Sequence, residues 1–545
     1  MLRKSLPSTS PPWHPSLTHF DLQMLLDAVF GTRPPAWLGA FDTRDWALTI
    51  IAFVALWIVH IRRTRIALPP GPKGLPIIGN VLQLPRDKEW LQYDDWGKEY
   101  GPIFHLSLPL GEKLIVINSH KVAIDILEKN ANAFAARPTN MVMATDLIGW
   151  GRAVALHPGG EKHRKYRRLL SKVLNSTAVR KFRPLEQRAA EAFLQELYRT
   201  PDDFIKHIRD SVGSMIVELS YGRDTKIGEA GFIDYAEYVH EIFTYAARSF
   251  AFVVDIVPIL QHIPEWIPGV TWKKQATQWR KELDLMAQVP FDMVKSDMKG
   301  EAFSDSYVSV SLDGKKSAAD DDHEADVKWT AVSLYTGGAD TTIASLNALF
   351  LLMCLHPEAQ SRAQKEIDAV VGPDRLPTAE DEPDLPFVGA IVKEILRYWT
   401  IAPLGLPHRA MEGTIYESYL IPKGSTIIAN LWGMMHDPTV YSDPYEFKPE
   451  RFLPVEQGGL GEPDPTPTIF GFGRRICPGM HLATASVWIY SACILASFNI
   501  KPVKNERGED VMPVAETGPE MIRMPKPFKC QVVPRSSNTA ALLGF

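Results

Sequence analysis

Ten residues near the C-terminus decide the fold of this chain: Phe470-Gly471-Phe472-Gly473-Arg474-Arg475-Ile476-Cys477-Pro478-Gly479. Three glycines in this stretch allow positive φ angles and let a flat ligand approach the backbone closely. A long apolar segment, 482–495, follows at once and predicts a helix. Pro478 suits the first turn of that helix, where no backbone N–H is needed. The sequence therefore predicts that Cys477 lies at a helix N-terminus.

Cys477 is the candidate metal ligand of the chain. The dipole and the free N–H groups of a helix N-terminus favour the thiolate over the thiol. A thiolate held in this way is a good axial ligand for haem iron, and it pushes electron density toward cleavage of the O–O bond. The alternative is a buried cysteine in a turn. The phenylalanines, glycines and arginines around Cys477 favour the ligand.

The same stretch carries a family resemblance. The pattern Phe-x-x-Gly-x-Arg-x-Cys-x-Gly is matched at Phe470, Gly473, Arg475, Cys477 and Gly479. It resembles the cysteine-ligand loop of the haem-thiolate monooxygenases, the cytochrome P450 family, and the resemblance extends from about residue 68 to residue 535. It implies haem b as the cofactor, Cys477 as the axial ligand of its iron, and the other four residues as part of the cofactor pocket.

Length and composition fit a single large catalytic domain. The chain has 545 residues, 45% of them hydrophobic, and no Gly/Ser linker divides it. The net charge of −5 gives no reason to expect nucleic acid as a partner. Four cysteines are too few and too scattered for a disulfide framework or a zinc site, and they fit a reducing compartment that faces the cytosol.

The N-terminal region predicts a membrane anchor. Residues 46–61 are apolar apart from Thr49 and His60, and as a helix they would span about 24 Å, slightly short for a hydrocarbon core of about 30 Å. Arginines at 62, 63 and 65 follow, so the positive-inside rule places the catalytic domain in the cytosol and residues 1–45 across the membrane. The alternative is a buried core helix. We expect a single-pass protein of the endoplasmic reticulum membrane.

A basic and proline-rich hinge, 62–80, is predicted after the anchor. Its prolines stiffen residues 69–76 into an extended spacer, and this spacer resembles the proline hinge of membrane-bound members of the same family. The catalytic domain is expected over 81–535, with a short C-terminal tail over 536–545.

A basic helix is predicted over 161–174. In the family a helix at this place usually carries Trp-x-x-x-Arg, which reaches a haem propionate, and this chain has His163 and Arg167 at those positions. The resemblance implies Arg167 as a cofactor ligand, while the histidine departs from the family pattern. The other basic residues of the helix form either a solvated face or a docking surface for an acidic redox partner.

A long helix is predicted over 326–355, and it contains Gly337-Gly338-Ala339-Asp340-Thr341-Thr342. Each glycine inside a helix costs roughly 1 kcal/mol relative to alanine, so a pair indicates a need for backbone room. Thr341 is four residues after Gly337, which places its hydroxyl to bond to that carbonyl and open the helix. The alternative is a glycine pair required by packing, with a solvated Asp340. The segment resembles the family's Ala/Gly-Gly-x-Asp/Glu-Thr-Thr, which implies that Asp340 and Thr341 deliver protons to dioxygen during its activation.

Charged motifs follow in the C-terminal third: Glu394-x-x-Arg397, Pro407-His408-Arg409 and Pro449-Glu450-Arg451-Phe452. The i, i+3 spacing places Glu394 and Arg397 on one face of a helix over 388–399. The resemblance implies that these two residues and Arg451 form a structural charge triad behind the haem. It also implies propionate contacts from Arg409 and Arg475, because a guanidinium suits carboxylates.

The sequence as a whole predicts a mainly helical cytochrome P450 fold with small β-sheets. The resemblance implies a monooxygenase that inserts one atom of O2 into an apolar small molecule, and it looks most like fungal members of secondary or xenobiotic metabolism. Electrons are expected from NADPH through a separate NADPH–cytochrome reductase, because the chain has no glycine-rich dinucleotide fingerprint of its own. The rivals are a haem-thiolate isomerase or dehydratase, which needs no reductase, and a non-enzymatic, membrane-tethered haem sensor.

Overall fold

The computed structural model describes residue 52 and residues 66–85, 87–247, 252–300, 305–313, 321–518 and 521–545. The chain divides into two compact units, and the larger one, 68–265 with 272–545, carries every site residue predicted from the sequence. The predicted segment 1–45 and the predicted anchor 46–61 lie, apart from residue 52, outside the described residues.

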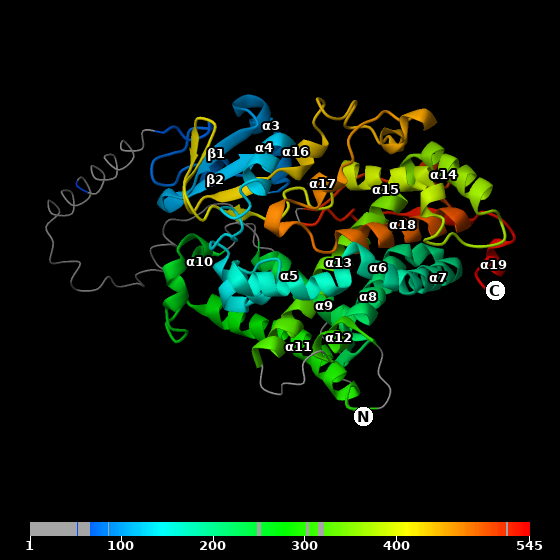
Figure 1. Cartoon of the computed structure of the whole chain (residues 1–545), viewed down its shortest axis with the longest axis horizontal. Helices are drawn as coiled ribbons and strands as arrows, with labels where there is room; N and C mark the ends of the chain where they lie inside the picture. Colours follow the sequence, from blue (N-terminus) through cyan, green and yellow to red (C-terminus); the bar gives the residue numbers. More distant parts are fainter. Residues whose placement is uncertain are drawn as a thin grey trace. The chain divides into compact units, whose positions relative to one another are not determined.

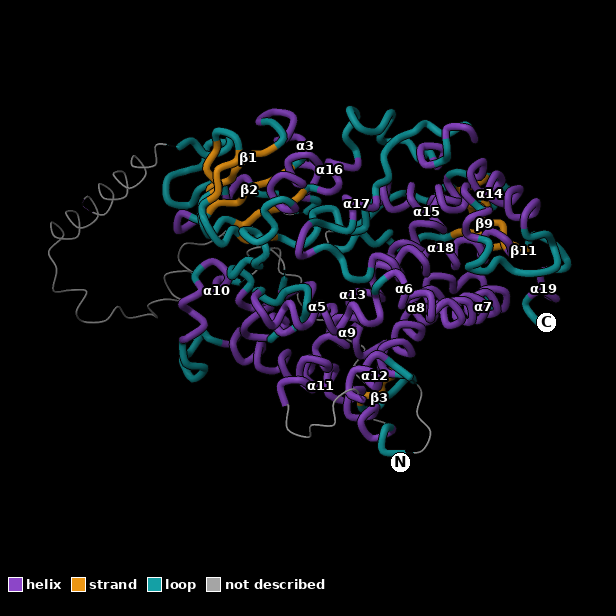
Figure 2. Tube along the Cα trace, viewed as in Figure 1, coloured by secondary structure: helices purple, strands orange, loops and turns teal. Residues whose placement is uncertain are grey.

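The larger unit is mainly helical, as the sequence predicts (Figures 1 and 2). Its α-helices are α3 (Glu89–Tyr100), α4 (His120–Ala123), α5 (Gly160–Leu174), α6 (Ser176–Val179), α7 (Arg183–Arg199), α8 (Phe204–Tyr221), α9 (Phe232–Ala246), α10 (Val253–Ile256), α11 (Thr271–Asp297), α12 (Tyr307–Asp313), α13 (Asp321–Leu355), α14 (Pro357–Val370), α15 (Pro386–Trp399), α16 (Leu431–Met435), α17 (Thr466–Ile469), α18 (Met480–Ser497) and α19 (Thr539–Leu542).

The strands form small sheets. One sheet has the order β1 (Ile103–Ser107), β2 (Lys113–Ile117), β8 (Thr426–Ala429) and β5 (His408–Arg409), and a second has the order β10 (Asp510–Val511), β9 (Phe498–Lys504) and β11 (Cys530–Pro534). Two hairpins pair β3 (Lys226–Ile227) with β4 (Ala230–Gly231) and β6 (Thr414–Tyr416) with β7 (Tyr419–Ile421). The strands β1 and β2 pair in antiparallel register, with Ile103 opposite Ile117.

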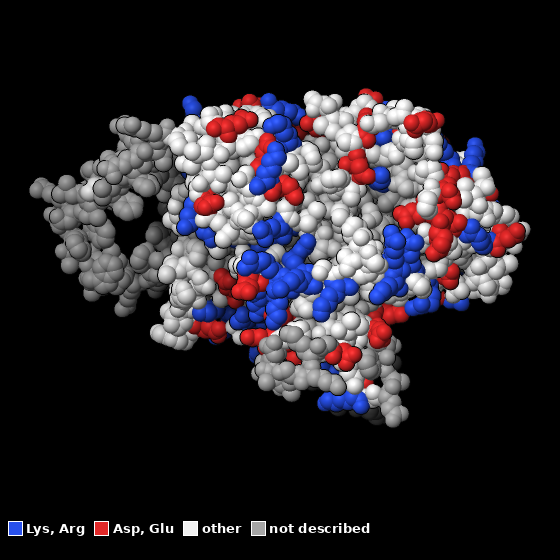
Figure 3. Space-filling model, viewed as in Figure 1, with Lys and Arg blue, Asp and Glu red and all other residues white. Residues whose placement is uncertain are grey.

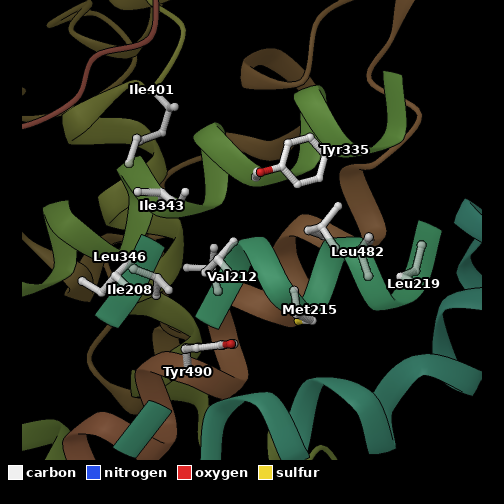
Figure 4. Packing of buried hydrophobic residues seen from close by; sticks show 14 of the residues in the cluster. Ile208, Val212, Met215, Leu219, Tyr335, Ile343, Leu346, Ile401, Leu482 and Tyr490 are labelled. Atoms are coloured by element: carbon white, nitrogen blue, oxygen red, sulfur yellow. The ribbon is translucent and has the colours of Figure 1, made fainter. Parts of the chain in front are cut away.

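The core is built around α13, which packs against α5, α8 and α18. Figure 4 shows side chains of α8, among them Val212 and Met215, lying near Leu346 of α13 and Leu482 of α18. By length and composition α13 and α18 would cross a membrane, but 78% and 67% of their most apolar windows are buried. Helices that are apolar on all sides and enclosed in this way are core helices.

The helix α13 begins at Asp321, five positions before the predicted start at 326. Near this end α13 forms an ion-pair contact with α5. Asp326 is 2% exposed, and its carboxylate lies 2.6 Å from Lys165 Nζ and 3.5 Å from Lys162 Nζ. Two lysines of the predicted basic face therefore tie α5 to α13, because a buried carboxylate needs a cation beside it.

The predicted charge triad is present. Arg397 donates to both carboxylate oxygens of Glu394, at 2.7 and 2.8 Å, and Arg451 Nε lies 3.3 Å from Glu394 Oε1. All three side chains are fully buried. Arg397 also donates to the backbone carbonyls of Met435 and Pro444. The triad thus joins α15 to the segment that leads to the Cys477 loop.

We expect Glu394→Gln to destabilise the protein by about 3–5 kcal/mol, because it leaves two buried guanidiniums without their shared anion. The matched control is Glu196→Gln, which removes the same i, i+3 contact to Arg199 where both side chains are more than half exposed, and it should cost no more than about 1 kcal/mol. Urea unfolding monitored by circular dichroism compares the two. Equal losses would show that the triad is not structural.

Candidate active site

The Cys477 loop is a closed turn that admits no side chain at one glycine. The Cys477 N–H donates to the Phe470 carbonyl at 2.8 Å. Gly473 has φ +57°, and a Cβ there would lie 2.3 Å from the Leu127 carbonyl oxygen. Its N–H donates to Glu128 at 2.5 Å. Only glycine fits this conformation and this contact.

Cys477 lies directly before the N-terminus of α18, as predicted. The helix begins at Met480 with Gly479 as its N-cap residue, so Pro478 precedes the first turn instead of occupying it. The thiol is free. Burial raises the pKa of the Cys477 thiol, while the N–H groups of Gly479 and Met480 and the charge of Arg167 oppose this, and burial prevails. The helix end alone thus does not ionise the thiol, whereas coordination to a metal ion does so outright.

Three arginines surround this loop: Arg137 and Arg475 are buried, and Arg167 is half-buried. Arg475 donates to the carbonyls of Ala135 and His157 at 2.6 and 2.8 Å. Arg167 donates to the Ile476 carbonyl, next to Cys477, at 2.6 Å. No ion pair links any of the three to a carboxylate of the described residues.

Arg137 is the most enclosed of the three cations. It donates to the carbonyls of Ala155, Leu406 and Pro407 at 2.7–2.8 Å. Burial, with a smaller effect from Arg475, lowers the pKa of Arg137 to about 9. Burial and then Arg167 lower the pKa of Arg475 to about 10. These shifts show concentrated positive charge that lacks an anion.

Buried histidines complete this cluster without adding negative charge. His163 and His408 are 6% and 8% exposed. Burial, followed by the neighbouring arginines, lowers the pKa of each to about 3, so both are neutral at physiological pH. The His157 ring stacks 6.3 Å from the His163 ring. We call Arg137, His157, His163, Arg167, His408 and Arg475 the cationic cluster.

The hydrogen bond that the sequence predicts within α13 is present. Thr341 Oγ1 donates to the Gly337 carbonyl at 2.9 Å, and Thr342 Oγ1 donates to the Gly338 carbonyl at 2.7 Å. A Cβ on Gly337 would meet nothing within 4 Å, whereas one on Gly338 would lie 3.2 Å from Ile216 of α8. Gly338 therefore serves packing, and Gly337 faces open space.

Asp340 is not a solvated side chain. Its Oδ2 lies 2.6 Å from His240 Nδ1 on α9. The side chain of Asp340 is 33% exposed, so it lies where the interior meets solvent. A carboxylate in that position is suited to pass protons inward.

Comparison with known proteins decides the family. The family described as Cytochrome P450 matches residues 69–532. The chain belongs to the cytochrome P450 family. It is 38% identical to cytochrome P450 monooxygenase 208 of Postia placenta over 92% of this chain and 98% of that protein. It is 39% identical to cytochrome P450 monooxygenase claR of Ampulloclitocybe clavipes over 91% of each chain, and 34% identical to the multifunctional cytochrome P450 monooxygenase af510 of Aspergillus fumigatus over 92% and 96%.

The residues of this P450 fit haem. The cationic cluster requires anions, and haem carries two propionates. Cys477 offers one thiolate, and among the described ranges no group of three or more His, Cys, Asp or Glu gathers as a metal-binding set. A surface hollow of about 580 Å³ beside α7 and the C-terminal tail includes none of the predicted site residues.

The structure does not place Arg409 in the cationic cluster. Its guanidinium donates to Thr139 at 2.7 Å at an exposed position, and the side chain that joins the cluster from β5 is His408. The sequence did not predict Arg137 or His408 as a site residue. For Arg137 the available signal was a lone arginine after the apolar run Ala133-Phe134-Ala135-Ala136. The role of Arg409 as a propionate ligand stays a prediction.

Replacing Arg137 and Arg409 in turn shows which of the two residues holds haem. Arg137→Met should weaken haem retention by about 2 kcal/mol, on the order of 30-fold, because it removes a charged hydrogen-bond donor. Arg409→Met is the matched control and should retain haem like the unaltered protein. Transfer of haem to excess apomyoglobin measures the loss. If Arg409→Met releases haem faster than Arg137→Met, then Arg409 is the anchor and the cationic cluster is not.

Proposed function

We propose that this P450 is a haem-thiolate monooxygenase that inserts one atom of O2 into an apolar small molecule of fungal secondary or xenobiotic metabolism. The observation that carries the proposal is a free cysteine before α18, beside a cationic cluster whose arginines form no ion pair with a carboxylate of the described residues, combined with the Thr341–Gly337 hydrogen bond within α13. The names of the fungal relatives support the reaction class.

Each part of the site has a distinct task. Haem, when bound, supplies the activation of dioxygen. Cys477 would hold its iron as a thiolate, and Arg137, Arg167 and Arg475 would hold its propionates. Thr341 donates to the Gly337 carbonyl, which leaves its oxygen lone pairs free to accept a hydrogen bond from water. Asp340 would take protons from the solvent side and pass them toward Thr341.

Electrons would come from NADPH through a separate reductase. Exposed basic side chains gather on α5 and on the turn Arg180–Phe182 that follows α6: Lys162, Arg164, Arg168, Lys172, Arg180 and Lys181. Figure 3 shows a dense group of Lys and Arg in this part of the molecule. Four of these residues lie on the same helix as Arg167, which contacts the Cys477 loop. A positive surface there favours encounter with an acidic electron donor.

We also propose that the protein is anchored in the endoplasmic reticulum membrane with its catalytic domain in the cytosol. The support is the apolar segment 46–61 and the arginines that follow it. Protease added to intact microsomes should digest the catalytic domain and spare a short N-terminal fragment. Full protection of the catalytic domain from the protease would show that the topology is the opposite of the one proposed.

Thr341→Ala tests the reaction. The variant should keep haem and substrate binding, because the cysteine side is untouched, but it should divert NADPH oxidation from product to hydrogen peroxide. We expect the ratio of product to NADPH oxidised to fall by about tenfold, within the range of proton-transfer contributions. Thr336→Ala removes the same type of hydrogen bond, from Thr336 to the Val332 carbonyl at 3.0 Å, and is the matched control.

The measurement needs the purified protein, a P450 reductase, NADPH and a panel of terpenoids, steroids and polycyclic aromatics. An unchanged ratio in Thr341→Ala would place proton delivery elsewhere. Product that forms without NADPH would favour an isomerase or dehydratase. Haem binding without turnover of any substrate would favour a sensor.

A further inference from the structure

Asp340 has a charged partner that its own helix does not supply. His240 projects from α9, and its Nδ1 lies 2.6 Å from Asp340 Oδ2. The His240 side chain is 26% exposed, so water reaches the imidazole. The rings of His240 and Phe243 lie nearly perpendicular, with their centroids 5.7 Å apart. The His240–Asp340 pair therefore joins α9 to α13 at a position that solvent reaches.

The charges around His240 leave Asp340 as its main partner. Glu237, one turn earlier on α9, is itself paired with Arg209 of α8 at 2.6 Å. Tyr335 of α13 is buried and neutral, because burial and then Asp340 raise its pKa. Asp146, on the π-helical turn Met143–Ile148 that packs against α9, interacts with Arg280. Lys226 on β3 is exposed.

These surroundings favour the protonated imidazole. Burial opposes the charge, but the hydrogen bond and charge of Asp340, with a contribution from Glu237, outweigh it and raise the pKa of His240 above its ordinary value. A histidine with a raised pKa is charged and paired at lower pH and loses its proton as the pH rises through that raised value.

We propose that His240 is a positioning residue of the reaction: it holds Asp340 through the Nδ1–Oδ2 contact and recharges it with protons from solvent. This inference rests on the proposed function. It concerns the proton supply of that reaction, since each oxygen insertion consumes two electrons from NADPH and two protons. Helix α9 thereby contributes to chemistry that the sequence assigns to α13 alone.

The proton step balances without a further reagent. The Nδ1–H bond of the imidazolium breaks and an O–H bond forms at Asp340 Oδ2, which leaves a neutral imidazole and a carboxylic acid. Asp340 then releases its proton inward and becomes a carboxylate again. Neutral His240 regains a proton from bulk water, so the pair returns to its starting state.

His240→Asn tests the role of charge. The amide nitrogen occupies nearly the place of Nδ1 and still donates a hydrogen bond, but it carries no positive charge. In the unaltered protein we expect product formation to fall as the pH rises through the raised pKa of His240. His240→Asn should be roughly tenfold slower below that pKa and nearly independent of pH. His240→Lys keeps a cation to higher pH and should restore turnover there.

Two comparisons separate this role from simple packing. The double variant His240→Asn with Asp340→Asn should be no slower than Asp340→Asn alone, because both residues act in one step. His207→Asn, at an exposed histidine on α8 that contacts Thr200, should keep the full pH profile. A His240 that only packed would add its own loss in the double variant.

The effect of Asp340 on the pKa of His240 can also be measured without enzyme turnover. In the reduced, CO-bound protein with ¹³C-labelled histidine, the resonance missing from His240→Asn reports the pKa of His240. Asp340→Asn should lower that pKa. An unchanged pKa, or an unchanged pH profile in His240→Asn, would overturn the inference about His240 alone. Absence of any NADPH-dependent product from the unaltered protein would instead contradict the proposed function, and with it the role of His240.

Discussion

Enclosed positive charge that forms no ion pair within the described residues is the constraint on which this site depends. Arg137, Arg167 and Arg475 are bonded to backbone carbonyls around the Cys477 loop, which orients their guanidiniums but does not neutralise them. A buried ion without a counter-ion costs several kcal/mol. The neutral His163 and His408 beside them add donors and no negative charge. The propionates of haem would supply the missing anions, so cofactor binding and stability of this region are coupled.

The two sides of the site are held by one core. Helix α18 starts behind Cys477, and α13 carries Gly337 and Asp340, and these helices pack on each other and on α5 and α8. Gly338 fits against Ile216 of α8, while Gly337 beside it faces open space. The buried triad of Glu394, Arg397 and Arg451 fixes the segment that precedes the loop. Rigid helices thus position both the metal ligand and the proton pathway.

The sequence predicts the contacts of this site that join residues close together in the chain, but not those that join distant segments. The Thr341–Gly337 bond follows from i, i+4 spacing, and the place of Cys477 follows from the glycines and the apolar run after it. Contacts between distant segments were out of reach: Arg137 bonds to residues about 270 positions away, and Asp340 meets His240 from another helix. Arg409 and His408 are adjacent on β5, where successive side chains point to opposite faces. Sequence alone did not show which of the two faces the cluster.

The most direct test of the account is the absorption spectrum of the reduced, CO-bound protein. Ligation by Cys477 predicts the red-shifted Soret band of a thiolate complex, and Cys477→His should move that band to an imidazole-type position. The matched control, Cys530→Ala, removes a buried cysteine from β11 and should leave the band in place. An imidazole-type band in the unaltered protein, or a spectrum that Cys477→His leaves unchanged, would contradict Cys477 as the ligand.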